Sequence, residues 1–375
     1  MTQTIRKPTT LQDVAGALGM HKSTVSLALS GKGTISADTR RRVLSVAQEL
    51  GYEPNLLAQR LAHGQGTTMV CIFSGVLDVG LATEKILLVQ KALGSHSLEV
   101  PIYTCYDTAS GDVGEAQAAQ VRQLCRQRPR AIICAAQCVH PAVFRELGTY
   151  QHNGGIVVSY DAPVPLSCDQ VIFDREDNAY QAARHLLEQG HRRIGIGMSQ
   201  VGGRSDAQPG MTTSDPLNYR MRGFRRALEE FGVPFRDEWF FKNATYEKGG
   251  AEMAKQFLSL RERPTALAIV NDYVALAFMV EVMRAGVRIP HDLSLVGHDN
   301  QPIAAYCPVP LTSTTQPADR VAQAVVDVLM ARVADAPSRE VSPRTITITG
   351  KLVQRESVTS PAKPENPCSL KRNYG

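Results

Sequence analysis

The chain of 375 residues lacks the long apolar segment that a transmembrane helix needs, since no apolar run of about 18 residues occurs in it. Its first ten residues, MTQTIRKPTT, also lack the apolar core of a secretory signal. Both absences predict a cytoplasmic protein, associated with the nucleoid if it binds DNA, and with no membrane partner.

Metal-binding and catalytic signatures are missing as well. The eight cysteines are scattered, none forms a CxxC pair, and no zinc-ligand spacing occurs. We therefore expect free thiols in a reducing compartment, and neither a metal nor another cofactor. The patterns GxGxxG, GxxxxGK[ST], HExxH and GxSxG are also absent. An enzyme is therefore disfavoured, although a fold alone does not exclude one.

The most informative segment that is present covers residues 10–29, TLQDVAGALGMHKSTVSLAL. Apolar residues recur at helical spacing in two short stretches, and Gly19 between them can adopt positive φ in a tight turn. Ala15 is the small residue where the two helices approach, and Val25 closes their core. The pattern predicts a helix-turn-helix and makes DNA the first partner to consider.

A third helix is predicted over residues 36–50, with Ser36 as N-cap and Gly51 as the stop. Its inward stripe comprises Val43, Val46, Ala47 and Leu50. The three helices define a predicted DNA-binding headpiece at 1–53. Residues 1–66 hold eight Lys and Arg against four Asp and Glu, so this segment carries +4 of the chain's net +5. Such a basic head suits phosphate contact.

Residues 54–66 form a predicted linker that is bounded by Pro54 on one side and glycines on the other. Its segment LLAQRLAH is helix-prone but short, and isolated helices under about 12 residues are marginal in water. We expect it to fold only when a surface supports it.

From residue 69 onward, short β runs alternate with amphipathic helices, which predicts an α/β body of parallel sheets with helices on both faces. The predicted strands are 69–73, 99–105, 131–136, 155–160, 170–173, 193–198, 266–270, 293–298 and 344–350. The predicted helices include 178–189, 219–231, 249–260 and 274–285. The expected body spans 67–358, and a polar, Pro-rich tail at 359–375 is expected to be disordered.

The body is too large for a single compact core, so we divide it into two lobes. The predicted lobes are approximately 67–161 plus 317–328 and 162–316 plus 329–358.

Head, linker and body together resemble the lactose-repressor family of bacterial transcription regulators. In the head, the resemblance runs from TLQDVAGALG to LLAQRLAHG. In the body it is carried by NAYQAARHLLEQGHRRIG (178–195), YRMRGFRRAL (219–228), VND (270–272), IPHDLSLVGHDN (289–300), LTSTTQP (311–317) and LVQRES (352–357). It implies an all-α helix-turn-helix headpiece followed by a two-lobed periplasmic-binding-protein type I fold.

The resemblance also implies how DNA is read. The second helix enters the major groove, with Lys22, Ser23 and Leu27 toward the bases. Leu27 departs from the arginine often found at its position, and a leucine favours contact with a thymine methyl. The further expected DNA contacts are Thr10, Thr24, Ser26, Arg40, Asn55, Ala58 and Leu61. Leu61 is the expected wedge of a hinge helix, formed by the linker, that opens a central base step in the minor groove.

For the cleft, the resemblance implies a small polar effector, such as a sugar or a related metabolite. The candidate contacts are Asp161, Arg220, Asn271 and Asp299. Asp161, Asn271 and Asp299 follow predicted strands, and ligands of such sheets bind at the carboxyl ends of strands. Surface salt bridges are the alternative role of the charged members.

We therefore predict a homodimeric, ligand-responsive, sequence-specific regulator, acting as a repressor on a pseudo-palindromic operator of double-stranded DNA. The dimer contact is expected near residues 84–93 and 274–285. The alternatives are an architectural or constitutive DNA-binding protein without an effector, and an enzyme built on the body. A transported-solute binding protein would need a signal peptide and no helix-turn-helix.

Overall fold

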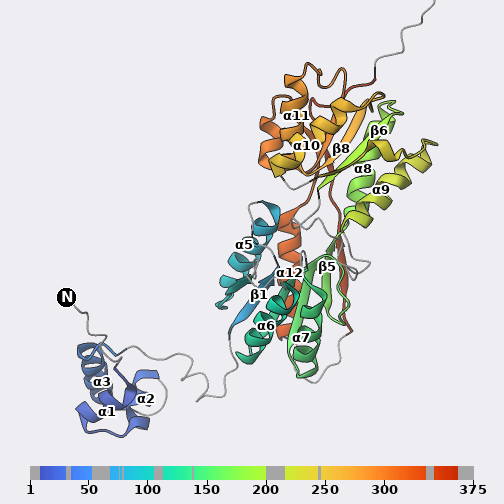
Figure 1. Ribbon diagram of the computed structural model, residues 1–375. Coiled ribbons are helices and arrows are strands. Elements are labelled where there is room, and N and C mark those ends of the chain that lie inside the picture. The colour runs from blue at the N-terminus through green and yellow to red at the C-terminus, as the bar shows by residue number, and fades with distance from the viewer. Residues whose placement is uncertain are drawn as a thin grey trace, which may run out of the picture. The chain divides into compact units, whose positions relative to one another are not determined.

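A computed structural model gives the structure of the chain (Figure 1). It describes residues 9–30, 35–52, 68–75, 77, 80–104, 113–136, 139–199, 216–243, 246–334 and 342–361. The chain divides into two compact units, Met1–Thr67 and Thr68–Gly375, and each is considered by itself.

The first unit contains the three predicted helices of the headpiece, α1 (Leu11–Leu18), α2 (Lys22–Ser30) and α3 (Ala37–Glu49). Thr10 caps α1 in a reciprocal arrangement with Asp13, and Ser36 caps α3 by accepting from the N–H of Thr39. Gly19 ends α1 with a φ of 61°, the left-handed conformation that the turn requires. The caps and the turn therefore fix where each helix begins and ends.

The headpiece core joins all three helices. Its buried members are Val14, Ala15, Val25, Ala28, Val43 and Ala47. The prediction for Leu50 is wrong, because its side chain is 41% exposed. Helix α3 ends at Glu49, so Leu50 lies in the C-terminal cap and no longer follows the inward stripe.

The second unit contains two six-stranded sheets, one in each lobe. In the first, the spatial order is β11 (Thr345–Ile348), β5 (Asp169–Phe173), β4 (Ile156–Asp161), β3 (Ala131–Ala135), β1 (Val70–Ser74) and β2 (Ile102–Thr104). In the second, it is β12 (Leu352–Val353), β10 (Thr312–Thr315), β9 (Ser294–Asp299), β8 (Ala266–Val270), β6 (Ile194–Ser199) and β7 (Phe240–Asn243). All pairings are parallel except that of β12 with β10.

Helices cover both faces of each sheet, as Figure 1 shows. The first lobe holds α5 (Leu81–Gly94), α6 (Val113–Arg126), α7 (Pro141–His152) and α12 (Ala318–Ala334). The second holds α8 (Arg175–Glu188), α9 (Pro216–Glu230), α10 (Tyr246–Ser259) and α11 (Asp272–Arg284). The helix α5 packs against α12 on one sheet, and α9 packs against α8 on the other. No helix among the described residues is long and apolar enough to cross a bilayer.

The chain crosses between the lobes three times, and the crossings correct the predicted lobe boundaries. Residues 317–328 lie in the first lobe as predicted, but strand β5, the end of α12 and strand β11 belong there as well and not to the second lobe. The crossings therefore lie after Phe173, after Thr315 and after Ile348. Hydrogen bonds join them, since the Asp174 N–H donates to the Ile348 carbonyl (2.9 Å) and the Thr315 N–H to the Lys351 carbonyl (2.7 Å).

The start of the predicted tail is also corrected. The carbonyl of Thr359 lies 2.9 Å from Nε2 of His191 and accepts from the hydroxyl of Ser294 at 3.1 Å. These bonds tie residue 359 to the second lobe, and residues 362–375 lie outside the described residues.

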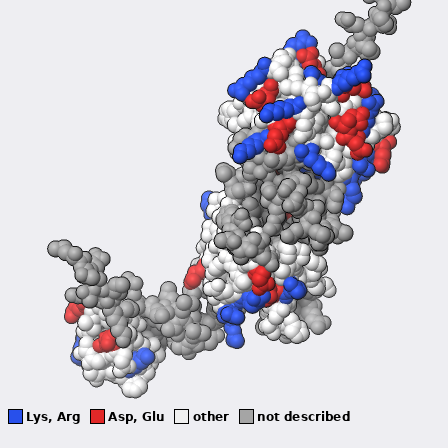
Figure 2. All heavy atoms as spheres, in the orientation of Figure 1, with Lys and Arg blue, Asp and Glu red and all other residues white. Residues whose placement is uncertain are grey.

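Charged side chains are interspersed on the face of the second lobe that Figure 2 shows, with blue and red atoms side by side. Several of them form exposed ion pairs, such as Arg288 with Asp292 at 2.5 Å. Exposed pairs of this kind contribute about 1 kcal/mol or less. They therefore contribute little to holding the lobe together.

Candidate functional site

The candidate DNA-reading surface lies on α2. Val25 and Ala28 of this helix are buried in the headpiece core, whereas Lys22, Ser23 and Leu27 are exposed. Leu27 is 39% exposed. The helix therefore turns one face into the core and presents the three predicted base-facing side chains on the other.

The other predicted DNA contacts have more varied surroundings. Thr24 and Ser26 are half-buried, and so is Arg40 near the start of α3. The hydroxyl of Thr10 donates to Asp13 (2.7 Å) and caps α1, which is a structural role. The hydroxyl of Ser23 lies 2.8 Å from Nδ1 of His21. Asn55, Ala58 and Leu61, with the whole predicted hinge helix, lie outside the described residues.

In the body, two of the predicted effector contacts occupy equivalent places in the two lobes. Asp161 ends β4 and Asp299 ends β9, and each of these strands is third from the same end of its sheet. Both residues have positive φ, 87° and 92°. Such conformations are uncommon outside glycine and concentrate at functional sites. The repeated fold thus places one aspartate with a strained backbone at the end of the third strand in each lobe.

Asp161 is 2% exposed and lies between two buried cations. The ammonium of Lys85, on α5, donates to its Oδ1 at 2.5 Å, and a guanidinium N–H of Arg175 lies 3.1 Å from its Oδ2. Burial alone would raise the pKa of Asp161, but the charges of Arg175 and Lys85 outweigh it and hold that pKa below its usual range. The carboxylate is therefore ionised, and both cations depend on it.

A side-chain relay connects this cluster with Asp299. The ammonium of Lys85 also donates to Oε1 of Gln316, and Nε2 of Gln316 donates to Oδ1 of Asp299 at 2.9 Å. Gln316 lies just after β10, where the chain crosses back to the first lobe. The structure therefore brings Asp161 and Asp299 into one polar network that spans both lobes.

Arg220 and His298 lie near this network in the second lobe. Arg220, on α9, is buried, and its charge contributes to the low pKa of His298. His298 precedes Asp299 on β9 and is fully buried, with Nδ1 lying 3.1 Å from the Ile269 carbonyl. Burial and then the charge of Arg220 lower its pKa to about 4. Its ring is therefore neutral at pH 7, and Nδ1 donates to the carbonyl.

The low pKa of His298 predicts a pH-dependent stability. Its pKa is about 4 in the folded protein against an ordinary 6.5, so the unfolded chain binds more protons between these values. Lowering the pH from 7 to 5 should therefore cost about 2 kcal/mol of unfolding free energy through this residue. Denaturant unfolding at both pH values should show a smaller loss for His298→Phe than for the wild type. The exposed His291→Gln should behave as the wild type, and an equal loss in His298→Phe would contradict the assignment.

Asn271, the fourth predicted contact, caps α11 at the end of β8. Its Oδ1 accepts from the N–H groups of Tyr273 (3.1 Å) and Val274 (3.2 Å). Next to it, the buried carboxyl of Asp272 accepts from the Gln301 N–H and the Ser313 hydroxyl, both at 2.7 Å. Asp272 therefore holds the loop that follows Asp299, while the oxygen of Asn271 serves the helix.

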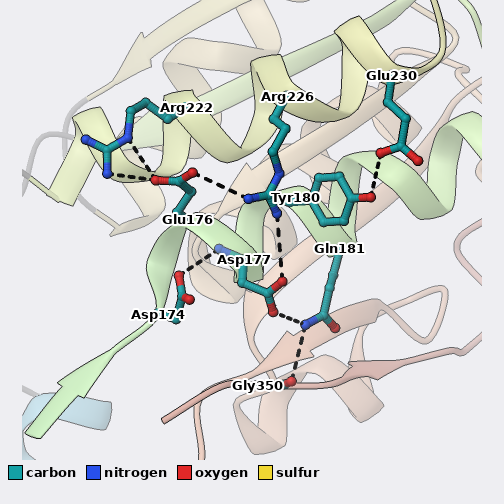
Figure 3. A network of polar contacts seen from close by, with 9 residues as sticks. All are labelled: Asp174, Glu176, Asp177, Tyr180, Gln181, Arg222, Arg226, Glu230 and Gly350. Carbon is teal, nitrogen blue, oxygen red and sulfur yellow. Dashed lines mark hydrogen bonds and ion pairs between the residues drawn. The ribbon is translucent and has the colours of Figure 1, made fainter. Parts of the chain in front are cut away.

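A pocket of about 190 Å³ adjoins Arg175 on the crossing segments. Residues of both lobes line it, namely Ala162, Pro163, Ile172, Phe173, Asp174, Arg175, Glu176, Tyr219, Arg222 and Thr347. Glu176 and Arg222 form part of its second-lobe wall, and Figure 3 shows the ion pairs by which Arg222 and Arg226 of α9 reach Glu176 of α8. This wall ties the two helices to each other beside the crossing.

Three members of the network were not anticipated from the sequence. Lys85 lies at a spacing of four from Val89 and eight from Leu93, both on the buried stripe of α5. A lysine at such a position is a signal of a buried ion pair that could have been used. Arg175 and Gln316 directly follow the sites where the chain changes lobe, a position that the sequence alone did not locate.

Comparison with known proteins agrees with this architecture. The family described as "Bacterial regulatory proteins, lacI family" matches residues 10–55, and "Periplasmic binding protein-like domain" matches 183–358. The HTH-type transcriptional repressor PurR of Yersinia pestis bv. Antiqua (strain Antiqua) is 27% identical over 349 residues, covering 93% of this chain and 96% of the relative.

Two solved structures share the fold. A Lac repressor dimer bound to operator and the anti-inducer ONPF has a TM-score of 0.76 at 23% identity, covering 94% of this chain and 100% of its own. A complex of the transcriptional regulator CelR with cellobiose has a TM-score of 0.64 at 23% identity, covering 93% and 99%.

A helix-turn-helix head that matches bacterial regulatory proteins is joined here to a two-lobed, periplasmic binding protein-like body, a combination typical of DNA-binding transcriptional regulators. Residues 10–55 thus carry the DNA-binding domain of the lacI family of bacterial regulatory proteins, as the sequence resemblance implies, and the predicted fold class is confirmed.

Proposed function

We propose that this regulator acts as a dimeric repressor, in which α2 reads base edges and a small polar effector in the interlobe cleft changes operator affinity through residues 54–66. The observation that carries the proposal is the exposure of Lys22, Ser23 and Leu27 on a helix whose opposite face is buried. The repressor relative and the Lac repressor dimer bound to its operator support the mode of action.

The effector arm of the proposal assigns the contacts to Asp161, Arg220, Asn271 and Asp299. Asp161 and Asp299 contribute acceptors for hydroxyl or amino groups, and Arg220 contributes donors. The CelR–cellobiose complex supports a sugar or a related polar metabolite as the ligand. Binding rather than catalysis is proposed for this site, and a cytoplasmic location follows from the DNA target.

Two exposed apolar side chains support the proposed dimer surface along the body. Leu87 on α5 is 51% exposed, and Met283 on α11 is also exposed. Both lie within the helices that the sequence analysis assigned to the dimer contact. A dimer would place two heads on half-sites related by its two-fold axis.

The decisive experiment is selection of bound duplexes from a random DNA pool by the purified full-length protein. The proposal expects a two-fold symmetric consensus with a deformable pyrimidine–purine step at its centre. A constitutive DNA-binding protein would yield a consensus but no change of affinity with any cell metabolite. Absence of a consensus, both with and without added metabolite extract, would remove sequence-specific repression.

The substitution Leu27→Arg should change which bases are selected. An arginine at this exposed position can donate two hydrogen bonds to guanine, whereas leucine can only contact apolar groups such as the thymine methyl. We expect discrimination of about tenfold or more for guanine at one position of each half-site, because a bidentate contact is worth about 1–3 kcal/mol. Parallel selections with the wild type and Leu27→Lys, which adds charge without the planar fork, separate base reading from general attraction. An unaltered consensus would show that residue 27 does not face the bases.

A further inference from the structure

Each lobe has a buried cation at the same position of an equivalent helix, namely Lys85 in the first lobe and Arg220 in the second. Lys85 is the fifth residue of α5, and Arg220 is the fifth residue of α9. These helices follow equivalent strands, β1 and β6, and both cations are buried. Lys85 bonds the aspartate that ends the third strand of its sheet, and Arg220 acts on His298, next to the aspartate that ends the third strand of the other sheet. Lys85 donates to two different side chains, Asp161 and Gln316.

The ammonium of Lys85 has three N–H donors, and two of them have named acceptors. One bonds to the carboxylate of Asp161 and one to the amide oxygen of Gln316. The ring of Phe173 lies 6.0 Å from the same nitrogen, at the edge of cation–π range. With 1% of the side chain exposed, water does not compete for these partners.

The same contacts bridge the lobes. Asp161, Lys85 and Phe173 belong to the first lobe, whereas Asp299 belongs to the second and is reached through Gln316 at the crossing. The relay therefore satisfies, without any ligand, oxygen atoms of both carboxylates that the proposed function assigns to the effector. A hydroxyl or amino group of an effector would need these same acceptors.

We propose that Lys85 is a built-in ligand of the interlobe cleft: its ammonium on Asp161, and the Gln316 amide that it holds on Asp299, occupy the acceptors of an effector's donor groups and hold the two lobes together in its absence. The inference rests on the proposed function only in identifying Asp161 and Asp299 as effector contacts. An incoming effector then exchanges with Lys85 rather than filling an open site. Since a ligand shifts an equilibrium only by its differential affinity, the energy of the Lys85 contacts sets how strongly an effector must bind the other state.

The test measures the distance between the lobes in the full-length, ligand-free protein, and compares the wild type with a variant that lacks the ammonium of Lys85. Spin labels attached through unnatural amino acids at Arg145 and Lys255, exposed on α7 and α10, report it by pulsed electron paramagnetic resonance. The substitution Lys85→Met keeps a long side chain and removes the charge, and Arg175 remains to pair with Asp161. Lys91→Met, on the exposed face of the same helix, is the matched control.

We expect the ratio of open to closed populations to rise roughly tenfold or more in Lys85→Met, as loss of a charged hydrogen bond requires, and to stay unchanged in Lys91→Met. Wild-type distances in Lys85→Met would overturn the proposal. If Lys85→Met does not fold, Gln316→Met interrupts the relay while leaving the Lys85–Asp161 pair intact. It should open the lobes as well, and unchanged distances in that variant would be equally decisive. Because no DNA or effector is used, these outcomes stand apart from those of the operator selection.

Discussion

The substitution Val25→Asp should abolish operator binding while leaving the body folded. Val25 is fully buried in the core that α2 shares with α1 and α3, so an aspartate there would place a carboxylate without a partner among apolar side chains. Such burial costs several kcal/mol. At the usual unfolding free energy per residue, a headpiece of this size has a total stability of only about 2–7 kcal/mol. We therefore expect the headpiece to unfold and operator affinity to fall by more than about a hundredfold.

Fluorescence anisotropy with the selected operator measures the affinity, and circular dichroism during thermal unfolding shows whether the body is intact. Leu44→Asp is the matched control, because it adds the same charge at an exposed leucine on α3. It should retain most of the affinity, since surface substitutions change stability by about 0.5 kcal/mol or less. Operator binding by Val25→Asp at the wild-type level would contradict the packing of α2.

How much of the headpiece could be predicted follows from its local determinants. The cap at Ser36, the turn at Gly19 and the apolar spacing all lie within a few residues of the features that they control, so the helix positions were correct. Leu50 was misplaced because periodicity does not show where a helix ends to within one residue.

In the body, the predicted strands did not include β7, β10 or β12. Strand β10, TSTT, was missed because Thr312, Ser313 and Thr314 are polar, yet all three are fully buried. Their hydroxyls are satisfied by hydrogen bonds, such as Ser313 to Asp272 at 2.7 Å and Thr314 to Asn178 at 2.7 Å. These partners lie far away in the sequence, so hydropathy alone could not reveal the strand. The lobe boundaries failed because they depend on which sheet β5 and β11 join, and a strand's own sequence does not show its partner.

The candidate effector site was predictable in part. Asp161 and Asp299 stand at strand ends, and strand ends are visible in the sequence. The cations that neutralise and link them are not, because Lys85 is 76 residues from Asp161 and 231 residues from Gln316. Whether a charged residue of an amphipathic helix faces water or a partner is decided by tertiary packing, which periodicity does not encode.

The substitution Asp161→Asn should be among the most destabilising changes in the body. It keeps the shape of the side chain and removes the only negative charge that directly contacts both Lys85 and Arg175 among the described residues. Both cations are buried, so water cannot replace the carboxylate. Breaking a buried ion pair by removing one partner costs about 3–5 kcal/mol. Denaturant unfolding at pH 7 should show a loss of this size.

Asp292→Asn provides the matched control, because Asp292 also lies 2.5 Å from a cation, Arg288, but on the surface. That pair should contribute about 1 kcal/mol or less, so Asp292→Asn measures the loss of an exposed carboxylate for comparison with the buried one. Combining Asp161→Asn with Lys85→Met removes one uncompensated cation and should recover part of the loss, which is the non-additivity expected of directly coupled residues. Additive losses in the double variant would mean that Asp161 stabilises the body through its backbone conformation rather than through its charge.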